Sequence, residues 1–116
     1  TLSARRPVAD TKRIAGMLQH AEIIATARNT EDDVVGVARS ISDFHYCTYL
    51  SDLAVDAAYQ RQGIGKRLID FTHQQAGLHT ALLLLSAPAA TTYYPKIGMV
   101  RHESCWMIKA KTETAG

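Results

Sequence analysis

A short glycine-containing turn, Gln60-Arg61-Gln62-Gly63-Ile64-Gly65, constrains the fold of this chain more than any other stretch. It stands between an apolar segment that ends in Leu53-Ala54-Val55 and a segment with helical spacing. Backbone N–H groups at the start of a helix form an anion-binding nest, and glycines let a phosphate approach the backbone closely. The turn therefore predicts a phosphate-binding site between a strand and a helix.

The spacing excludes two common phosphate-binding motifs. A P-loop needs G-x-x-x-x-G-K-[ST], whereas the glycines of this turn are only two residues apart and Lys66 is followed by arginine. A dinucleotide fingerprint needs a third glycine or alanine and an acidic residue about 20 positions further on. Leu68 and Leu85 occupy those two positions, so a different phosphate-binding family is expected.

The hydrophobic pattern predicts an α/β fold in the order α-β-β-β-α-β-α-β. Asp10 or Thr11 can cap the first helix, and Ile64, Leu68 and either Ile69 or Phe71 should form the inner face of the second. The apolar run at 80–87 is typical of a strand buried on both faces. The β-α-β unit makes two strands of a mixed sheet parallel. The expected helices are 10–20, 63–76 and 89–97, and the expected strands are 22–28, 34–41, 47–55, 80–87 and 99–109.

Length and composition narrow the class of protein. A chain of 116 residues is expected to form one domain, residues 1–116. The net charge of +2 is too small to imply a nucleic-acid partner, even with a basic cluster near the start. No apolar run is long enough to span a membrane, and the first residues lack the apolar core of a signal peptide.

The cysteines and histidines predict no metal site. Cys47 and Cys105 are too few for a disulfide framework, and each lies in an apolar run. We expect both to be reduced thiols, in the core or at the surface of a cytoplasmic protein. The five histidines show no paired ligand spacing with these cysteines, so zinc is not expected.

The turn and a second motif resemble the GCN5-related N-acetyltransferase (GNAT) superfamily. Gln60-Arg61-Gln62-Gly63-Ile64-Gly65 resembles its Q-x-x-G-x-G signature, which holds the pyrophosphate of acetyl-coenzyme A. Residues 87–99 resemble its later motif, in which Tyr94, Lys96 and Gly98 fit and Met99 replaces the usual phenylalanine. The resemblance covers about residues 22–109. The chain lacks the family's usual first strand and part of its first helical region, so residues 5–21 would be the second helix.

The resemblance implies transfer of an acetyl group from acetyl-coenzyme A to a primary amine by direct attack. The strand before the turn would pair with the pantetheine arm, and the turn would hold the pyrophosphate. Ser86, Ala87 and Ala90 would line the other lip, although Ala87 stands where many relatives have asparagine. The expected cofactor-binding residues are Leu53, Ala54, Val55, Gln60, Arg61, Gln62, Gly63, Ile64, Gly65, Lys66, Ser86, Ala87 and Ala90.

Two residues are candidates for proton transfer. Tyr94 matches the family's general-acid tyrosine, and a phenol with a pKa of about 10 can protonate a thiolate. Some relatives carry Glu-Asp where this chain has Ser51-Asp52. Asp52 could be the base or substrate anchor, or a structural carboxylate, and strand alternation places it on the opposite face from Ser51 and Leu53. Asp43 and Glu22 are weaker options for the base.

Two functions from different classes remain open. The first is an enzyme whose acceptor is a small amine, an aminoglycoside or a peptide or protein amine. The second is a non-catalytic acyl-coenzyme A-binding module that senses the cofactor. The segment "SCWMIKA" near the C-terminus could pair subunits in a homodimer.

Overall fold

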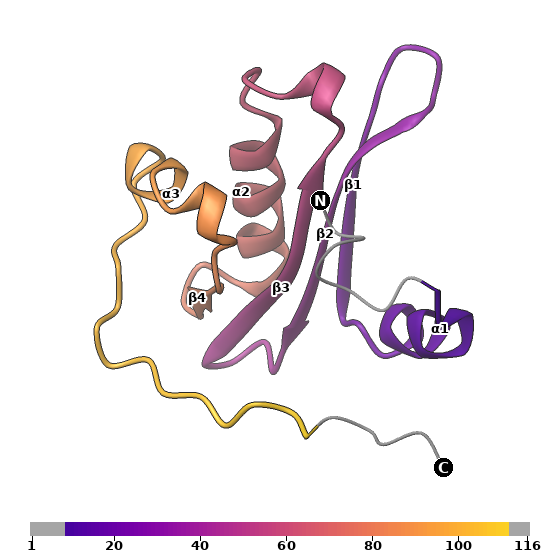
Figure 1. Cartoon of the computed structure of the whole chain (residues 1–116). Helices are drawn as coiled ribbons and strands as arrows, with labels where there is room; N and C mark the ends of the chain where they lie inside the picture. Colours follow the sequence, from indigo (N-terminus) through magenta and orange to yellow (C-terminus); the bar gives the residue numbers. More distant parts are fainter. Residues whose placement is uncertain (1–8, 112–116) are drawn as a thin grey trace. The chain divides into compact units, whose positions relative to one another are not determined.

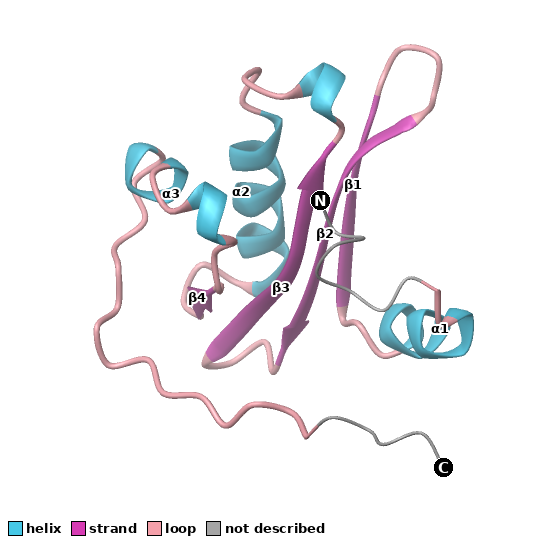
Figure 2. Ribbon diagram, viewed as in Figure 1, coloured by secondary structure: helices cyan, strands magenta, loops and turns pink. Residues whose placement is uncertain are grey.

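The computed structural model describes residues 9–111, which fall into two compact units divided between Leu85 and Ser86. In the first unit, a four-stranded sheet of order β1-β2-β3-β4 is covered on one face by helix α2 (Figures 1 and 2). This is the mixed α/β fold that the sequence predicts. The basic residues Arg5 and Arg6 lie outside the described residues.

The first three strands form an antiparallel meander. Strand β1, Ile23–Arg28, pairs with β2, Val34–Ser42, and β2 pairs with β3, Cys47–Val55. All three match their predicted ranges to within one residue at each end. Ala25, Ala38 and Leu50 are almost fully buried, so the core lies between this meander and α2.

The first helix, α1, extends from Thr11 to Gln19 and confirms the predicted helix. Of the two candidate caps the structure uses Asp10, whose carboxylate accepts a hydrogen bond of 3.0 Å from the backbone N–H of Arg13. Such a bond satisfies one of the free N–H groups that every helix start leaves open.

Helix α2, Ile64–Ala76, lies against the sheet through its buried residues Leu68, Ile69, Thr72 and Ala76. Phe71 is half exposed, so Ile69 is the inner-face residue of the two that the spacing allowed. The helix packs closely on β2 at Gly36, where an added Cβ would lie 3.1 Å from Leu68 Cδ1. Gly77, at φ 109°, ends the helix in a conformation that favours glycine.

The prediction for the fourth strand was wrong in length and in burial. Strand β4 comprises only Ala81–Leu83 and pairs in parallel with β3. Among residues 9–111 it forms the edge of the sheet, with a ladder partner on one side, and Leu83 is 51% exposed. A continuous apolar run therefore did not imply burial on both faces, because a face is buried only where a helix or another layer packs against it.

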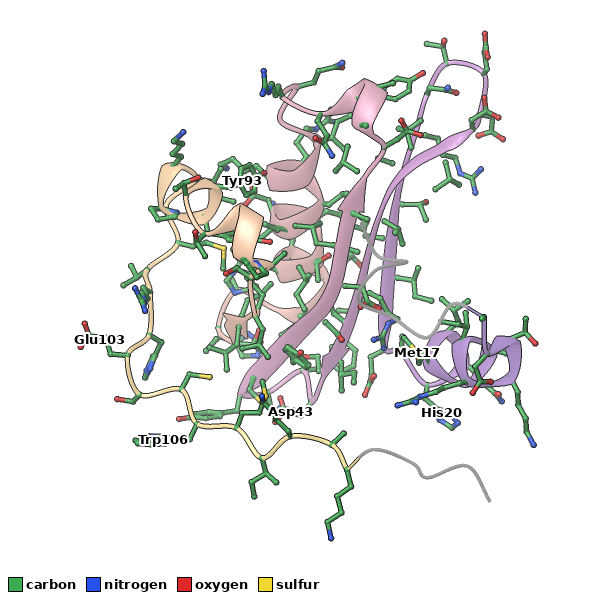
Figure 3. All side chains as sticks on the ribbon, in the orientation of Figure 1. Met17, His20, Asp43, Tyr93, Glu103 and Trp106 are labelled. Carbon is green, nitrogen blue, oxygen red and sulfur yellow. The ribbon has the colours of Figure 1, made fainter. Side chains whose placement is uncertain are left out.

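The second unit contains two short helical turns, η3 (Pro88–Ala90) and α3 (Tyr93–Lys96), in place of the single predicted helix 89–97. The strand predicted at 99–109 was also wrong, because these residues form no regular structure. The side chains of Trp106 and Ile108 are 92% and 99% exposed (Trp106 is labelled in Figure 3). A strand exists only when another strand satisfies its backbone groups, and this segment pairs with none in the described part of the chain.

Candidate active site and cofactor-binding turn

The predicted phosphate turn follows β3 through a single 3-10 turn, η2, Ala57–Tyr59. The side chain of Gln60 donates a hydrogen bond of 3.0 Å to the backbone oxygen of Val55, at the end of β3. The Tyr59 hydroxyl accepts one of 3.0 Å from the side chain of Asn29, in the β1–β2 connection. These two bonds hold the turn to the end of the sheet.

Two residues of the turn adopt left-handed backbone conformations, Arg61 at φ 65° and Gly63 at φ 80°. Gly63 is the N-cap of α2 and provides no side-chain cap. The N–H groups of the first helical turn, which form the positive end of the helix dipole, are therefore not capped by its side chain and can bind an anion. A Cβ added at Gly63 would meet nothing within 4 Å, which leaves open space above the turn. This geometry suits an anion that bonds to backbone N–H groups.

The left-handed conformation of Gly63 predicts a measurable cost for alanine. A Gly63→Ala variant is expected to lose about 1–2 kcal/mol of unfolding free energy, because an L side chain disfavours this region. Gly16→Ala is the matched control, since an added Cβ there also meets nothing within 4 Å but the residue lies inside α1. The control should gain up to about 1 kcal/mol. Urea denaturation of both variants would contradict this reading if the two changes had the same sign.

The positive charges of the turn are arranged unequally. The Lys66 ammonium pairs with Asp70 Oδ2 at 2.7 Å, one helical turn further on, so its charge is already partly balanced. The side chain of Arg61 is exposed at the turn itself. Arg67 lines a hollow of about 820 Å³ beside the turn, together with Tyr59 and Gln62. Arg61 and Arg67 are therefore exposed charges beside the turn, whereas the charge of Lys66 is paired with Asp70.

The strand that leads to the turn has an open edge. Strand β4 accompanies β3 only as far as the pair Tyr49 and Leu83, whereas β3 continues to Val55. Leu53, Ala54 and Val55 thus have β2 on one side and no strand on the other among the described residues. An open edge offers backbone groups to an extended ligand, as in β-strand addition.

A one-residue bulge interrupts the pairing of β2 and β3. Arg39 pairs with Asp52, but the next residue of β2 pairs with Leu50, so Ser51 is the extra residue. The Arg39 guanidinium forms a buried ion pair with the Asp52 carboxylate, and its Nη2 donates to Ser51 Oγ at 2.9 Å. Ser51 and Asp52 therefore lie on the same face. The prediction that they face opposite ways was wrong, because a bulge breaks simple alternation.

Arg39 was not among the predicted site residues. Its signal was a single charged residue inside the otherwise apolar strand VVGVARSI, opposite the only carboxylate of the next strand. A buried charge requires a partner, so this pair could have been proposed from the pattern. Its link to Ser51 could not, because the link depends on the bulge.

Asp43 lies in the connection between β2 and β3, at the other end of β3 from the turn (Figure 3). Its carboxylate accepts hydrogen bonds from the backbone N–H groups of Tyr46, His45 and Cys47. These bonds favour the charged form and lower the pKa of Asp43 from 3.8 to about 2. Through these three bonds, Asp43 orders the β2–β3 loop.

The lowered pKa predicts an acid-sensitive loop. A depressed pKa contributes stability above the unfolded value, and this contribution is lost as the pH falls from 3.8 towards 2. The amide hydrogen-exchange protection factors of residues 45–47, each taken relative to the intrinsic rate at the same pH, should therefore fall over this interval. An Asp43→Asn variant keeps an oxygen acceptor without a titrating carboxyl, so its exchange should show no such step. An identical step in the variant would contradict the assignment to Asp43.

The remaining predicted site residues, Ser86, Ala87, Ala90 and Tyr94, belong to the second unit. Tyr94 is the second residue of α3, and its ring meets that of Tyr93 edge to face, with centroids 5.2 Å apart. The backbone oxygen of Tyr94 accepts a bond of 3.1 Å from the N–H of Met99, across Gly98 at φ 90°. The motif glycine thus ends the helix that carries the tyrosine.

Residues 9–111 contain neither a membrane-spanning helix nor a cluster of metal ligands. None of the helices there is long and apolar enough to cross a membrane. Over the same residues, no group of three His, Cys, Asp or Glu side chains is placed to hold a metal ion. Cys47 and Cys105 are both free and exposed, so both are surface thiols.

The mixed sheet, and the turn that leads from β3 into α2, are those of an α/β protein of the acyltransferase class. A family model described as an acetyltransferase (GNAT) domain matches residues 19–100, most of the chain. The chain therefore belongs to the GNAT family of acetyltransferases, as the two motifs predicted, and acetyl-coenzyme A is the cofactor of this family. A search of curated proteins gives no match.

Solved structures of similar fold carry related activities. SP0256, a GNAT-family acetyltransferase from Streptococcus pneumoniae TIGR4, is 24% identical, with a TM-score of 0.69 over 88% of this chain and 80% of that chain. The aminoglycoside acetyltransferase meta-AAC0020, from an uncultured soil metagenomic sample, was solved with sisomicin; it is 23% identical, with a TM-score of 0.68 over 90% and 75%. A candidate streptothricin acetyltransferase from Bacillus anthracis str. Ames, solved with acetyl coenzyme A, is 26% identical, with a TM-score of 0.60 over 71% and 52%.

Proposed function

We propose that this chain is an N-acetyltransferase that moves an acetyl group from acetyl-coenzyme A to a primary amine by direct attack. The observation that carries the proposal is the uncapped N-terminus of α2, which follows the left-handed residues Arg61 and Gly63 at the end of an open strand edge. An anion site and an extended backbone edge, joined end to end, suit a ligand with a pyrophosphate and an amide-containing arm.

The residues present fit this cofactor. The backbone N–H groups of the turn and of the first turn of α2, residues 62–66, would bind the pyrophosphate, with Arg61 adding charge. Leu53, Ala54 and Val55 would pair with the pantetheine arm through backbone groups, which need an extended chain more than particular side chains. Ser86, Ala87 and Ala90, which belong to the second unit, are proposed as further cofactor-binding residues on the family motif alone. When bound, acetyl-coenzyme A supplies an acetyl group activated as a thioester.

Tyr94 is proposed as the general acid. Its phenol would hold the proton that the departing sulfur takes up, and phenols and thiols have pKa values within about two units of each other. The assignment rests on the family motif, in which Tyr94, Lys96 and Gly98 keep their expected spacing. Tyr94 also lies in a short helix whose end is fixed by the Met99 N–H bond.

Asp52 is proposed as a structural carboxylate, which was one of the two roles left open by the sequence. Its carboxylate is buried and forms an ion pair with the Arg39 guanidinium, which supports this role over that of the base. The acceptor must still lose a proton, because an alkylamine with a pKa of about 10.4 is mostly protonated at pH 7. We propose that water carries this proton away.

The acceptor is proposed to be a primary amine on a small molecule or peptide. One solved relative is an aminoglycoside acetyltransferase bound to sisomicin, and an aminoglycoside is therefore the first compound to try. A homodimer remains a further proposal. It is motivated by the exposed Trp106 and Ile108 in the C-terminal segment.

The experiment that tests the proposal is an acceptor screen. Free thiol released from acetyl-coenzyme A is measured with a panel of aminoglycosides, polyamines and peptides, alongside calorimetric binding of coenzyme A. Turnover with any amine supports the enzyme. Tight binding of coenzyme A without turnover on the whole panel favours the alternative, a cofactor-sensing module, and no binding at all contradicts both.

A further inference from the structure

The bulge at Ser51 lies close to the point where β3 stops pairing with β4. The last paired residue of β3 with β4 is Tyr49, and the bulge follows within two residues. A bulge bends a strand and increases its local twist. The course of Leu53–Val55 along the open edge is therefore set at this bulge.

The pairing on each side of the bulge is fixed by separate contacts. Towards the turn, Gly36 pairs with Val55 and is held against Leu68 of α2. Towards the other end, the hydroxyl of Thr48 bonds to those of Ser42 at 2.8 Å and Thr80 at 2.9 Å. The extra residue of the bulge must lie between Thr48 and Val55 of β3. Neither set of contacts determines which residue between them is the extra one.

Arg39 is placed to determine the position of the bulge. Its Nε bonds to Asp52 and its Nη2 to Ser51, so one side chain on β2 holds both residues of the bulge. The guanidinium is suited to this role, because its donors form a rigid planar fork that can serve two acceptors at once. A lysine ammonium in its place could keep the ion pair but not the same double contact.

We propose that Arg39 is a positioning residue for the cofactor: it fixes the bulge at Ser51 and thereby sets the course of Leu53–Val55, to which the pantetheine arm binds. This inference rests on the proposed function. Arg39 acts from β2, the strand on the side of β3 away from its open edge. It acts only through Ser51 and Asp52, and the phosphate turn is held independently by Gln60 and Tyr59.

The test separates the two halves of the cofactor. Calorimetry measures binding of coenzyme A and of its nucleotide half, adenosine 3′-phosphate 5′-diphosphate, to the full chain. An Arg39→Lys variant is expected to bind coenzyme A about tenfold more weakly, because the strand is no longer preorganised, with no change for the nucleotide half. Without ligand, amide hydrogen exchange of residues 51–53 should rise, and that of residues 60–65 should not.

Arg28→Lys is the matched control, since Arg28 also lies on a strand and pairs with a carboxylate, Asp32, but is exposed. It should leave both affinities unchanged. Ser51→Ala removes the acceptor of the Nη2 bond and keeps the ion pair of Arg39 with Asp52. It should weaken coenzyme A alone, by less than Arg39→Lys, and it replaces that variant if lysine prevents folding. Equal loss of both ligands, or no loss of coenzyme A, overturns the inference. A wild-type chain that binds neither ligand overturns the proposed function and this inference with it.

Discussion

A Tyr94→Phe variant is expected to lower kcat about 10²–10⁴-fold and to leave the affinity for coenzyme A unchanged, because general acid catalysis contributes a factor of this size. The change removes one hydroxyl and keeps the ring. The loss should be greatest at neutral pH and should shrink towards pH 9, where the leaving thiolate needs a proton less. Steady-state kinetics from pH 7 to 9, with calorimetry of the cofactor, provides both readouts.

The control for this variant is the neighbouring residue. Tyr93 and Tyr94 pack edge to face, and phenylalanine at position 93 keeps that aromatic contact. Tyr93→Phe is therefore expected to retain kcat within about twofold, since the packing area is preserved. If Tyr94→Phe turns over at the wild-type rate across this pH range, Tyr94 is not the general acid. If both variants lose activity equally, the effect comes from the helix rather than from the hydroxyl.

The features predicted correctly are those that local sequence decides. The bounds of β3 follow from its own apolar residues, and the start of α2 follows from Gly63. Both the glycine spacing and the helical periodicity can be read without knowing what lies beside them. The same holds for the α1 cap, because Asp10 bonds to a backbone group only three residues away. The position of the turn between β3 and α2 belongs to this group, whereas its role as a cofactor site stays a prediction.

The features predicted wrongly depend on partners far away in the chain. Residues 80–87 and 99–109 have apolar, strand-like patterns, yet β4 keeps three paired residues and residues 99–109 keep none. A pattern shows that a segment can pair, while the presence of a neighbouring strand decides whether it does. The contact of Arg39 with Ser51 was missed for a similar reason, because alternation assumes a regular ladder and the ladder contains an extra residue.

An Asp52→Asn variant is expected to lose about 3–5 kcal/mol of unfolding free energy, because it leaves the buried Arg39 guanidinium without a counter-charge. Asp52 and Arg39 are 6% and 8% exposed, so water cannot readily replace the lost carboxylate. Urea denaturation at neutral pH measures the change. Asp32→Asn is the matched control, because its ion pair with Arg28 is exposed and should contribute less than about 1 kcal/mol.

A double variant separates the structural role of Asp52 from a catalytic one. Arg39→Met with Asp52→Leu replaces the ion pair with apolar side chains, and such replacements often restore or exceed the original stability. If Asp52 is structural, the double variant should fold and, with saturating acetyl-coenzyme A, keep kcat within about tenfold of the wild type, since a general base contributes about 10²–10⁴-fold. A folded double variant that loses more than about 10²-fold in kcat would instead assign Asp52 as the base, because stability would then have been recovered without the chemistry.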